Sequence, residues 1–244
     1  NMGWMHDALG YLGLDPLHRA CHHDRVTFSL TYAHKERFVL PLSHDEVVHG
    51  KGALVHKMGG QWQHGLDQLR LLLGLQWLHP GKKLLFMGQE FGQDREWNQD
   101  VGLDWHLLAD PQRQGLLAWV AELNRLYRSC PALHASDSAA QGFAWVEGNN
   151  RDESMLVWQR HGGGQSLTVV LHFTPVDRRD HLVPMPSAGR WRILACSAWT
   201  RFGGASSESA PEVHAEVKFD RVFAQLNVPP FGVLVLERVG EAGL

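Results

Sequence analysis

The hydrophobic pattern of this 244-residue chain changes character near residue 135, and no other feature constrains the fold as much. Before that point, short apolar runs alternate with segments whose apolar residues recur every three or four positions. Such alternation is typical of strands and helices around a parallel sheet. After it, apolar and polar residues alternate in short segments separated by turn-rich stretches, as in antiparallel sheets. We therefore predict an α/β part at 1–134 and an antiparallel β-sandwich at 135–244.

The first part contains two candidate parallel strands and two amphipathic helices. FVLPL at 38–42 is one strand, and the apolar run at 84–87 predicts a second strand, covered on both faces. A helix with one buried face is expected between them. Its apolar stripe consists of Trp62, Leu66, Leu69, Leu73 and Trp77. A second amphipathic helix is predicted at 116–127, ending near Pro131.

The second part contains five segments with the alternation of half-buried strands. They read GFAWVE, SMLVWQRH, SLTVVLHFTPV, RWRILAC and VHAEVKF. Glycine-rich and proline-rich stretches such as HGGGQ and PMPSAGR lie between them and predict turns.

Composition excludes several classes of protein. A net charge of -3 gives no basic excess for binding nucleic acid or anionic lipid. No stretch reaches the ~20 apolar residues of a membrane span, and no secretory signal pattern opens the chain. Three widely spaced cysteines predict neither a disulfide framework nor a zinc ribbon, so we expect a cytoplasmic protein. The chain begins with Asn1, which is consistent with a piece of a longer protein.

Titratable side chains follow both candidate parallel strands. His44, Asp45 and Glu46 follow the first strand, and Glu90 follows the second. Catalytic groups collect at the carboxyl ends of parallel strands, so these residues are candidates for one site. An Asp-Glu pair after a strand is also typical of a helix N-terminus, where it stabilises the first turn. Both interpretations stay open at this point.

Two other stretches are rich in possible ligands. CHHD at 21–24 contains metal-binding residue types, but a solvated loop is the expected structure. His44 and His49 are five residues apart, which does not suit a helical zinc site. HGKGAL at 49–54 lacks the second glycine and the ending of a phosphate loop, so we expect an ordinary flexible loop there.

The chain has ten tryptophans, and Trp97 and Trp105 lie in a polar connection rather than on a helix stripe. Indole rings stack on the apolar faces of sugars, whose hydroxyls hydrogen-bond to nearby carboxylates. Core packing is the expected role of most of the others. Trp97 is therefore a candidate sugar contact.

Four stretches, in this order and spacing, resemble the C-terminal part of bacterial glycogen branching enzymes, of the α-amylase superfamily. They are NMGWMHDALGYL, FVLPLSHDEVVHGKGAL, PGKKLLFMGQEFGQDREWN and LDWHLL. The resemblance runs to about Leu126 and continues more loosely beyond it. It implies that 1–134 is the C-terminal part of a (β/α)8 barrel, whose seventh and eighth strands are FVLPL and LLFM, followed by a β-sandwich.

The resemblance also implies an activity and a site. The activity is retaining transglycosylation of α-glucan (glycogen or amylose): an α-1,4 bond is cleaved and the chain is re-attached through an α-1,6 bond, with no metal or cofactor. Asp45 and His44 would bind the donor sugar. Position after the strands makes five further residues candidates for glucan contact. They are Glu46, Glu90, Arg95, Trp97 and Asp104.

The family's nucleophilic Asp and acid/base Glu belong to the fourth and fifth strands, which would precede Asn1. We therefore expect the isolated chain to be inactive. The alternatives are another α-amylase-type hydrolase or glucosyltransferase, and a non-catalytic glucan-binding module. The sequence does not indicate an oligomeric state.

Overall fold

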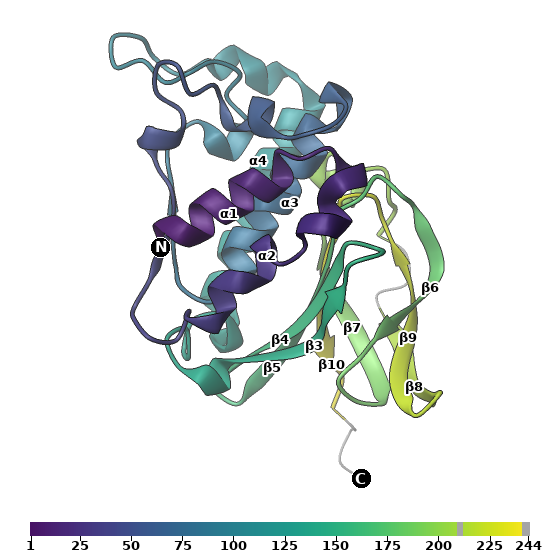
Figure 1. The fold of residues 1–244 in the computed structure, drawn as a ribbon. Coiled ribbons are helices and arrows are strands. Elements are labelled where there is room, and N and C mark those ends of the chain that lie inside the picture. The colour runs from purple at the N-terminus through teal and green to yellow at the C-terminus, as the bar shows by residue number, and fades with distance from the viewer. Residues whose placement is uncertain (209–211, 241–244) are drawn as a thin grey trace.

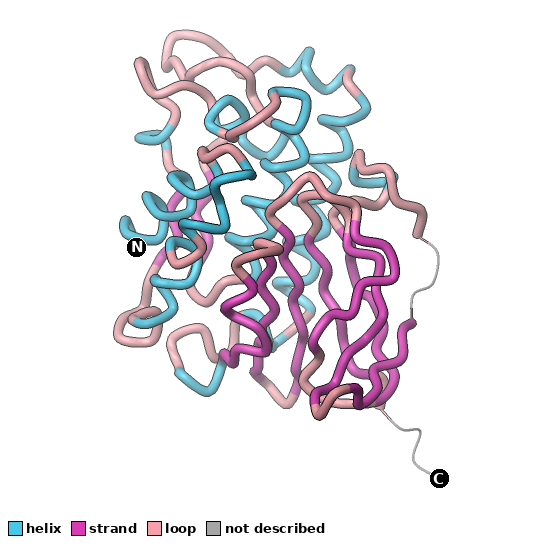
Figure 2. Tube along the Cα trace, turned by 45° about the vertical axis from the view of Figure 1, so that its right-hand side comes forward, coloured by secondary structure: helices cyan, strands magenta, loops and turns pink. Residues whose placement is uncertain are grey.

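The computed structural model describes residues 1–208 and 212–240. Its helices gather on one side of the molecule and its antiparallel strands on the other (Figures 1 and 2). The α-helices are α1 (Met2–Leu12), α2 (Arg25–Phe28), α3 (Gly65–Leu78) and α4 (Pro111–Ser129). The strands are β1 (Val39–Leu42), β2 (Lys82–Leu85), β3 (Phe143–Asn150), β4 (Met155–Gly162), β5 (Gln165–His172), β6 (Arg178–Pro184), β7 (Gly189–Cys196), β8 (Glu212–Lys218), β9 (Arg221–Val228) and β10 (Val233–Arg238).

β1 and β2 form a two-stranded parallel sheet, as predicted. Leu40 of β1 is fully buried, whereas Val39 is 41% exposed. On β2, Leu84 is 40% exposed, and Met87 just beyond the strand is 49% exposed. The prediction that the second strand is covered on both faces is therefore wrong for the described residues. Within the described part of the chain, β1 is the only strand that pairs with β2, and one face of this pair is exposed.

α3 lies between the two sheets, so the prediction of a helix with a single buried face is also wrong. Most of its residues are buried, polar ones included. On one side, the Gln76 amide donates to the carbonyls of Leu40 (2.9 Å) and Leu84 (2.8 Å), next to the parallel pair. On the other side, Gly74 packs so closely on Val233 of β10 that an added Cβ would lie 2.7 Å from a valine methyl. The side chain of Trp62, predicted on this helix stripe, lies outside the described part.

α4 confirms the second predicted helix. It begins at Pro111, with the Asp110 side chain accepting a hydrogen bond from the Gln112 N–H, which is a typical N-cap. Its apolar stripe is buried against α3 and the turn at 200–202. The buried members of that stripe are Leu116, Trp119, Val120, Leu123 and Leu126.

The remaining eight strands form one sheet in the order β3-β4-β5-β10-β7-β8-β9-β6, with every neighbouring pair antiparallel. Five of them, β3, β4, β5, β7 and β8, match the five predicted segments. β6, β9 and β10 were not predicted. β10 pairs with β5 and β7 in the middle of the sheet, so the antiparallel class was predicted correctly but its central strand was missed.

The sheet curls so that its two ends face each other around a second core. Met155 and Val170 share this core with Val183 and Leu226 from the opposite end. The sandwich we predicted is therefore one continuous hydrogen-bonded sheet folded over on itself. Its other face packs against α3, and the core there is continuous with that of the helical part.

CHHD is not a solvated loop as a whole. His23 is 1% exposed between short helical turns, although Cys21 is exposed. Among the described residues, no three metal-ligating side chains come together in a way that could hold an ion. None of the helices in that part of the chain has the length and apolarity needed to cross a membrane.

Candidate functional site

The end of β1 is shaped by Ser43, which caps a single 3-10 turn over His44–Glu46. Glu46 closes a capping box: one oxygen of its carboxylate accepts from the Ser43 N–H (2.6 Å) and hydroxyl (2.8 Å). Glu46 is 7% exposed, so its carboxylate is committed to the turn. Of the two alternatives for the Asp-Glu pair, stabilisation of a helical turn therefore describes Glu46.

Asp45 and His44 are left facing outward by the same turn. Their side chains are 71% and 53% exposed, and His44 Nε2 lies 3.2 Å from Asp45 Oδ1. An exposed carboxylate can accept hydrogen bonds from the hydroxyls of a polar ligand, and the neighbouring imidazole can donate one to them. The structure thus places this pair at the carboxyl end of a parallel strand, as predicted.

An aromatic wall stands beside the pair. The Trp97 ring meets the Phe86 ring edge-on, with centroids 5.2 Å apart, and lies 6.2 Å from the His44 ring. The backbone N–H of Trp97 donates to the Val47 carbonyl (2.7 Å), which ties the connection after β2 to the end of β1. Trp97 is half-buried by these contacts and still reaches a neighbouring pocket.

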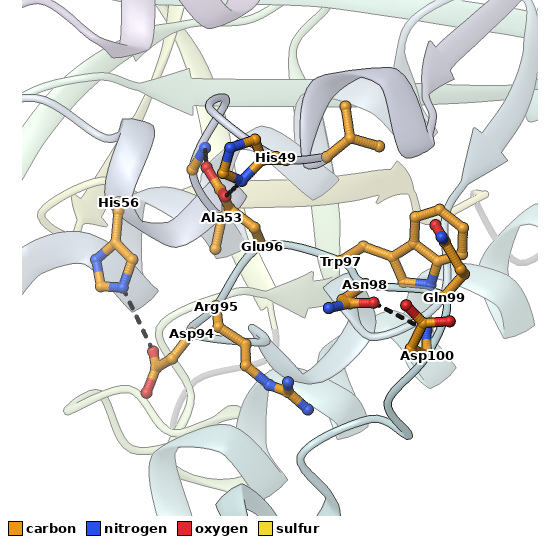
Figure 3. Close-up of a pocket in the computed structure, with 12 residues that line it drawn as sticks. His49, Ala53, His56, Asp94, Arg95, Glu96, Trp97, Asn98, Gln99 and Asp100 are labelled. Carbon is orange, nitrogen blue, oxygen red and sulfur yellow. Dashed lines mark hydrogen bonds and ion pairs between the residues drawn. The ribbon is translucent and has the colours of Figure 1, made fainter.

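That pocket has a volume of about 690 Å³ and lies between two loops that follow β1 and β2 (Figure 3). The lining from the first loop is Val48, His49, Gly52, Ala53 and His56, and that from the second is residues 94–100. Imidazole, carboxylate, guanidinium and amide groups therefore surround one hollow with an indole on its wall. This combination suits a ligand with many hydroxyl groups.

Arg95 and Asp104, two of the residues predicted to contact glucan, form an ion pair with each other. Arg95 Nε donates to Asp104 Oδ2 (2.6 Å), and Arg95 Nη2 donates to the Gly102 carbonyl (2.7 Å). The Asp104 N–H in turn donates to the Gln93 side chain (3.0 Å). These bonds hold the long connection in a fixed shape, and Arg95 also lines the pocket.

Glu90 is the predicted site residue that the structure places elsewhere. It lines a separate hollow of about 470 Å³ with Trp77, Leu85 and Met87, on the side facing α4. None of the other predicted site residues lines that hollow. The expectation that both strand-end carboxylates share one site is thus not met by Glu90.

Glu96 is the residue that sequence reasoning missed. Its carboxylate accepts a hydrogen bond from the Gly52 N–H (2.7 Å), and its second oxygen lies 3.6 Å from His49 Nδ1. The backbone N–H groups of Gly52, Gly50 and Lys51 lower its pKa below the usual range, because they stabilise the charged form. The loop HGKGAL, which we expected to be flexible, therefore holds an internal carboxylate.

A further contact braces the same two loops. His56 Nε2 lies 3.8 Å from Asp94 Oδ1, and the Arg113 guanidinium of α4 donates to that oxygen (2.6 Å). Arg113 also donates to the Gly92 carbonyl. The pocket wall is thus tied to a helix of the core.

Comparison with known proteins agrees with the motif resemblance. The family model "Alpha amylase, C-terminal all-beta domain" matches residues 145–239. The chain is 51% identical to "1,4-alpha-glucan branching enzyme GlgB" of Pseudomonas aeruginosa, over 98% of this chain and 33% of that protein. It is 55% identical to the protein of the same name from Roseobacter denitrificans, over 78% of this chain and 26% of that one.

A solved structure shows the same fold. The α-amylase from H. orenii superposes with a TM-score of 0.57 at 12% identity, covering 98% of this chain and 47% of that one. The chain spans about a third of the length of the Pseudomonas relative. It is therefore related, along nearly its whole length, to bacterial 1,4-α-glucan branching enzymes of the α-amylase family, whose C-terminal portion it resembles.

Proposed function

We propose that this chain is the C-terminal portion of a glycogen branching enzyme. Residues 1–134 would supply the seventh and eighth strands of a catalytic (β/α)8 barrel, and residues 135–244 the domain that follows it. The open face at Val39, Leu84 and Met87 supports this proposal, because parallel strands are normally covered on both faces. The free cysteines support our assignment to the cytoplasm.

The proposed reaction is retaining transglycosylation on an α-1,4-glucan. A carboxylate attacks the anomeric carbon while a carboxylic acid protonates the departing chain. The deprotonated acid then takes the proton of the 6-hydroxyl of another glucan, whose oxygen attacks the anomeric carbon, breaks its bond to the first carboxylate and forms an α-1,6 bond. In this proposal the attacking carboxylate and the carboxylic acid belong to other barrel strands, and no metal or cofactor is needed.

The observation that carries the proposal is the exposed His44–Asp45 pair at a parallel strand end, beside the Trp97 wall. Asp45 and His44 would bind hydroxyls of the sugar being transferred, and Trp97 would stack on a neighbouring ring. Arg95 and Asp104 would shape the loop that presents Trp97. Glu46, which closes the turn, and Glu90, which lies in another hollow, are left out of the proposed site.

A chimaera tests this proposal. The Pseudomonas relative is joined to this chain in place of its own matching segment, and amylose is assayed for new α-1,6 bonds. We expect the chimaera to branch amylose and its Asp45→Asn variant to lose at least about a hundredfold in rate, as when a transition-state contact is removed. Asp24→Asn, an exposed carboxylate before α2, is the matched control.

Four outcomes would contradict the proposal. Full activity of the Asp45→Asn chimaera would remove Asp45 from the site. Release of reducing ends without branches would favour the hydrolase alternative. Formation of α-1,6 bonds by the chain alone would show that it holds its own nucleophile. Saturable glycogen binding by the unmodified chain, together with an inactive chimaera, would instead favour the non-catalytic binding module.

A further inference from the structure

Several contacts join the two loops that follow the neighbouring parallel strands beside the candidate site. The loop after β1 contains Gly50, Lys51 and Gly52, and the loop after β2 contains Glu96 and Trp97. Two of these contacts lie next to Trp97: its backbone N–H donates to the Val47 carbonyl, and the Glu96 carboxylate accepts from the glycine loop. Figure 3 shows Glu96 and His49 turned toward each other across the gap.

The glycines of this loop are required by its backbone and not by a lack of space. Gly50 and Gly52 have φ angles of 80° and 74°, in the left-handed region, yet a Cβ at either would meet nothing within 4 Å. Successive N–H groups in such a conformation form a concave nest for an anion. Here the anion is a side chain of the same molecule: the Glu96 carboxylate accepts a hydrogen bond from the Gly52 N–H (2.7 Å).

Glu96 is adjacent in sequence to the indole that forms the wall of the site. Its anchoring fixes the backbone immediately before Trp97, whose ring lies against Phe86 and His44. The Glu96 side chain is 33% exposed, but its acceptor oxygens are directed to the glycine loop and His49. Glu96 is therefore suited to act through Trp97, with no need to touch a ligand itself.

We propose that Glu96 is a positioning residue, whose carboxylate docks into the Gly50–Gly52 nest and so holds Trp97 beside His44. The contacts described above support the docking of Glu96. That this docking matters for glucan transfer rests on the proposed function. For this reason the test reads the position of Trp97 in the unmodified chain and its variants, without an activity assay.

NMR of the whole chain gives the readout. The His44 ring signal senses the ring current of Trp97, and its displacement in Trp97→Ala sets the scale for complete loss of the contact. We expect Glu96→Ala to move the His44 signal by more than half of that displacement and to speed hydrogen exchange of the Gly52 amide. Glu96→Gln keeps an acceptor oxygen but not the charge, so it should fall between wild type and Glu96→Ala.

Glu90→Ala is the matched control, because Glu90 is a glutamate of the same connection that lines a different hollow. It should leave both readouts unchanged. An unmoved His44 signal in Glu96→Ala would overturn the proposal, as would an equal shift in Glu90→Ala. Collapse of the amide signals of β3–β10 in both Glu96 variants would also overturn it, because it would make Glu96 a residue of the whole fold. Each result holds whether or not the chimaera branches amylose.

Discussion

Two buried arginines join the helical part of the molecule to the antiparallel sheet, and their guanidinium groups have different kinds of partner. Arg160 of β4 donates to the carbonyls of Gly142, Leu78 and Leu133, and forms an ion pair with Asp137 (2.7 Å). Arg19 donates only to neutral acceptors, and no carboxylate pairs with it among the described residues. These acceptors are the carbonyls of Phe173, Leu12 and Leu14 and the side chain of Gln68.

Each arginine has a buried neutral histidine close by. His79 directly follows Leu78, an acceptor for Arg160, and His172 directly precedes Phe173, an acceptor for Arg19. Both arginines are fully buried, and burial lowers the pKa of Arg19 to about 10. The comparison teaches that a ring of carbonyls can accommodate a buried cation, but that only one junction depends on a charge pair. The predictions below test that difference.

The largest effect is expected from Arg160→Met. Asp137 is 8% exposed, and loss of Arg160 leaves its carboxylate with Lys82 and Tyr127 alone. Removing one partner of a buried pair typically costs about 3 to 5 kcal/mol, so the free energy of unfolding should fall by that amount in a urea titration. The double variant with Asp137→Asn should recover part of the loss. A loss below about 1 kcal/mol would contradict a charge-dependent junction.

The second largest effect is expected on the pH dependence of stability. Burial lowers the pKa of His172 to about 4, and the nearby Arg178 guanidinium lowers it further, whereas the Pro229 carbonyl, 3.1 Å from Nδ1, partly opposes this shift. A histidine that is protonated only in the unfolded chain makes stability fall as the pH drops from about 6.5 to about 4. Across this pH range, His172 alone should lower the free energy of unfolding by about 3 kcal/mol. Burial also lowers the pKa of His79 to about 3, so the Arg160 junction should likewise lose stability as the pH falls.

Unfolding titrations at pH 7, 5.5 and 4.5 measure this effect. His172→Gln should flatten the decline, because glutamine does not titrate, while the exposed His18→Gln should leave it unchanged. A decline of the same steepness in His172→Gln would assign the acid sensitivity to other groups. His79→Gln then shows whether the Arg160 junction contributes in the same way.

The fold classes could be predicted because the hydrophobic period changes near residue 135, but the junctions could not. The apolar stripe predicted for α3 leaves out Gln68 and Gln76, yet both are buried, and their side-chain N–H groups donate to backbone carbonyls of other segments. β6 escaped prediction because its pairing shifts register between Arg178 and His181, which breaks the alternation. β10 is apolar on both faces, so it lacks the alternation that we searched for.

The candidate site shows the same limit. His44 and Asp45 could be predicted as candidates because strand ends concentrate polar groups and because their motif resembles a known family. Glu96 could not, because its role depends on a glycine loop 44 residues away in the sequence. Its position directly before Trp97 was the only signal. Contacts between distant loops leave no periodic pattern in a single sequence.

The smallest effect is expected from Arg19→Met. Methionine keeps much of the apolar stem near Tyr11 and Phe231, whose ring centroids lie 5.8 and 5.7 Å from the guanidinium carbon. The variant leaves several acceptors without a donor, which costs stability, but it also removes the burial of an unpaired cation, which opposes that loss. We expect a net decrease of about 1 to 2 kcal/mol in the free energy of unfolding. If Arg19→Met costs as much as Arg160→Met, a ring of carbonyls holds a buried cation as firmly as a carboxylate does, and the distinction between the two junctions fails.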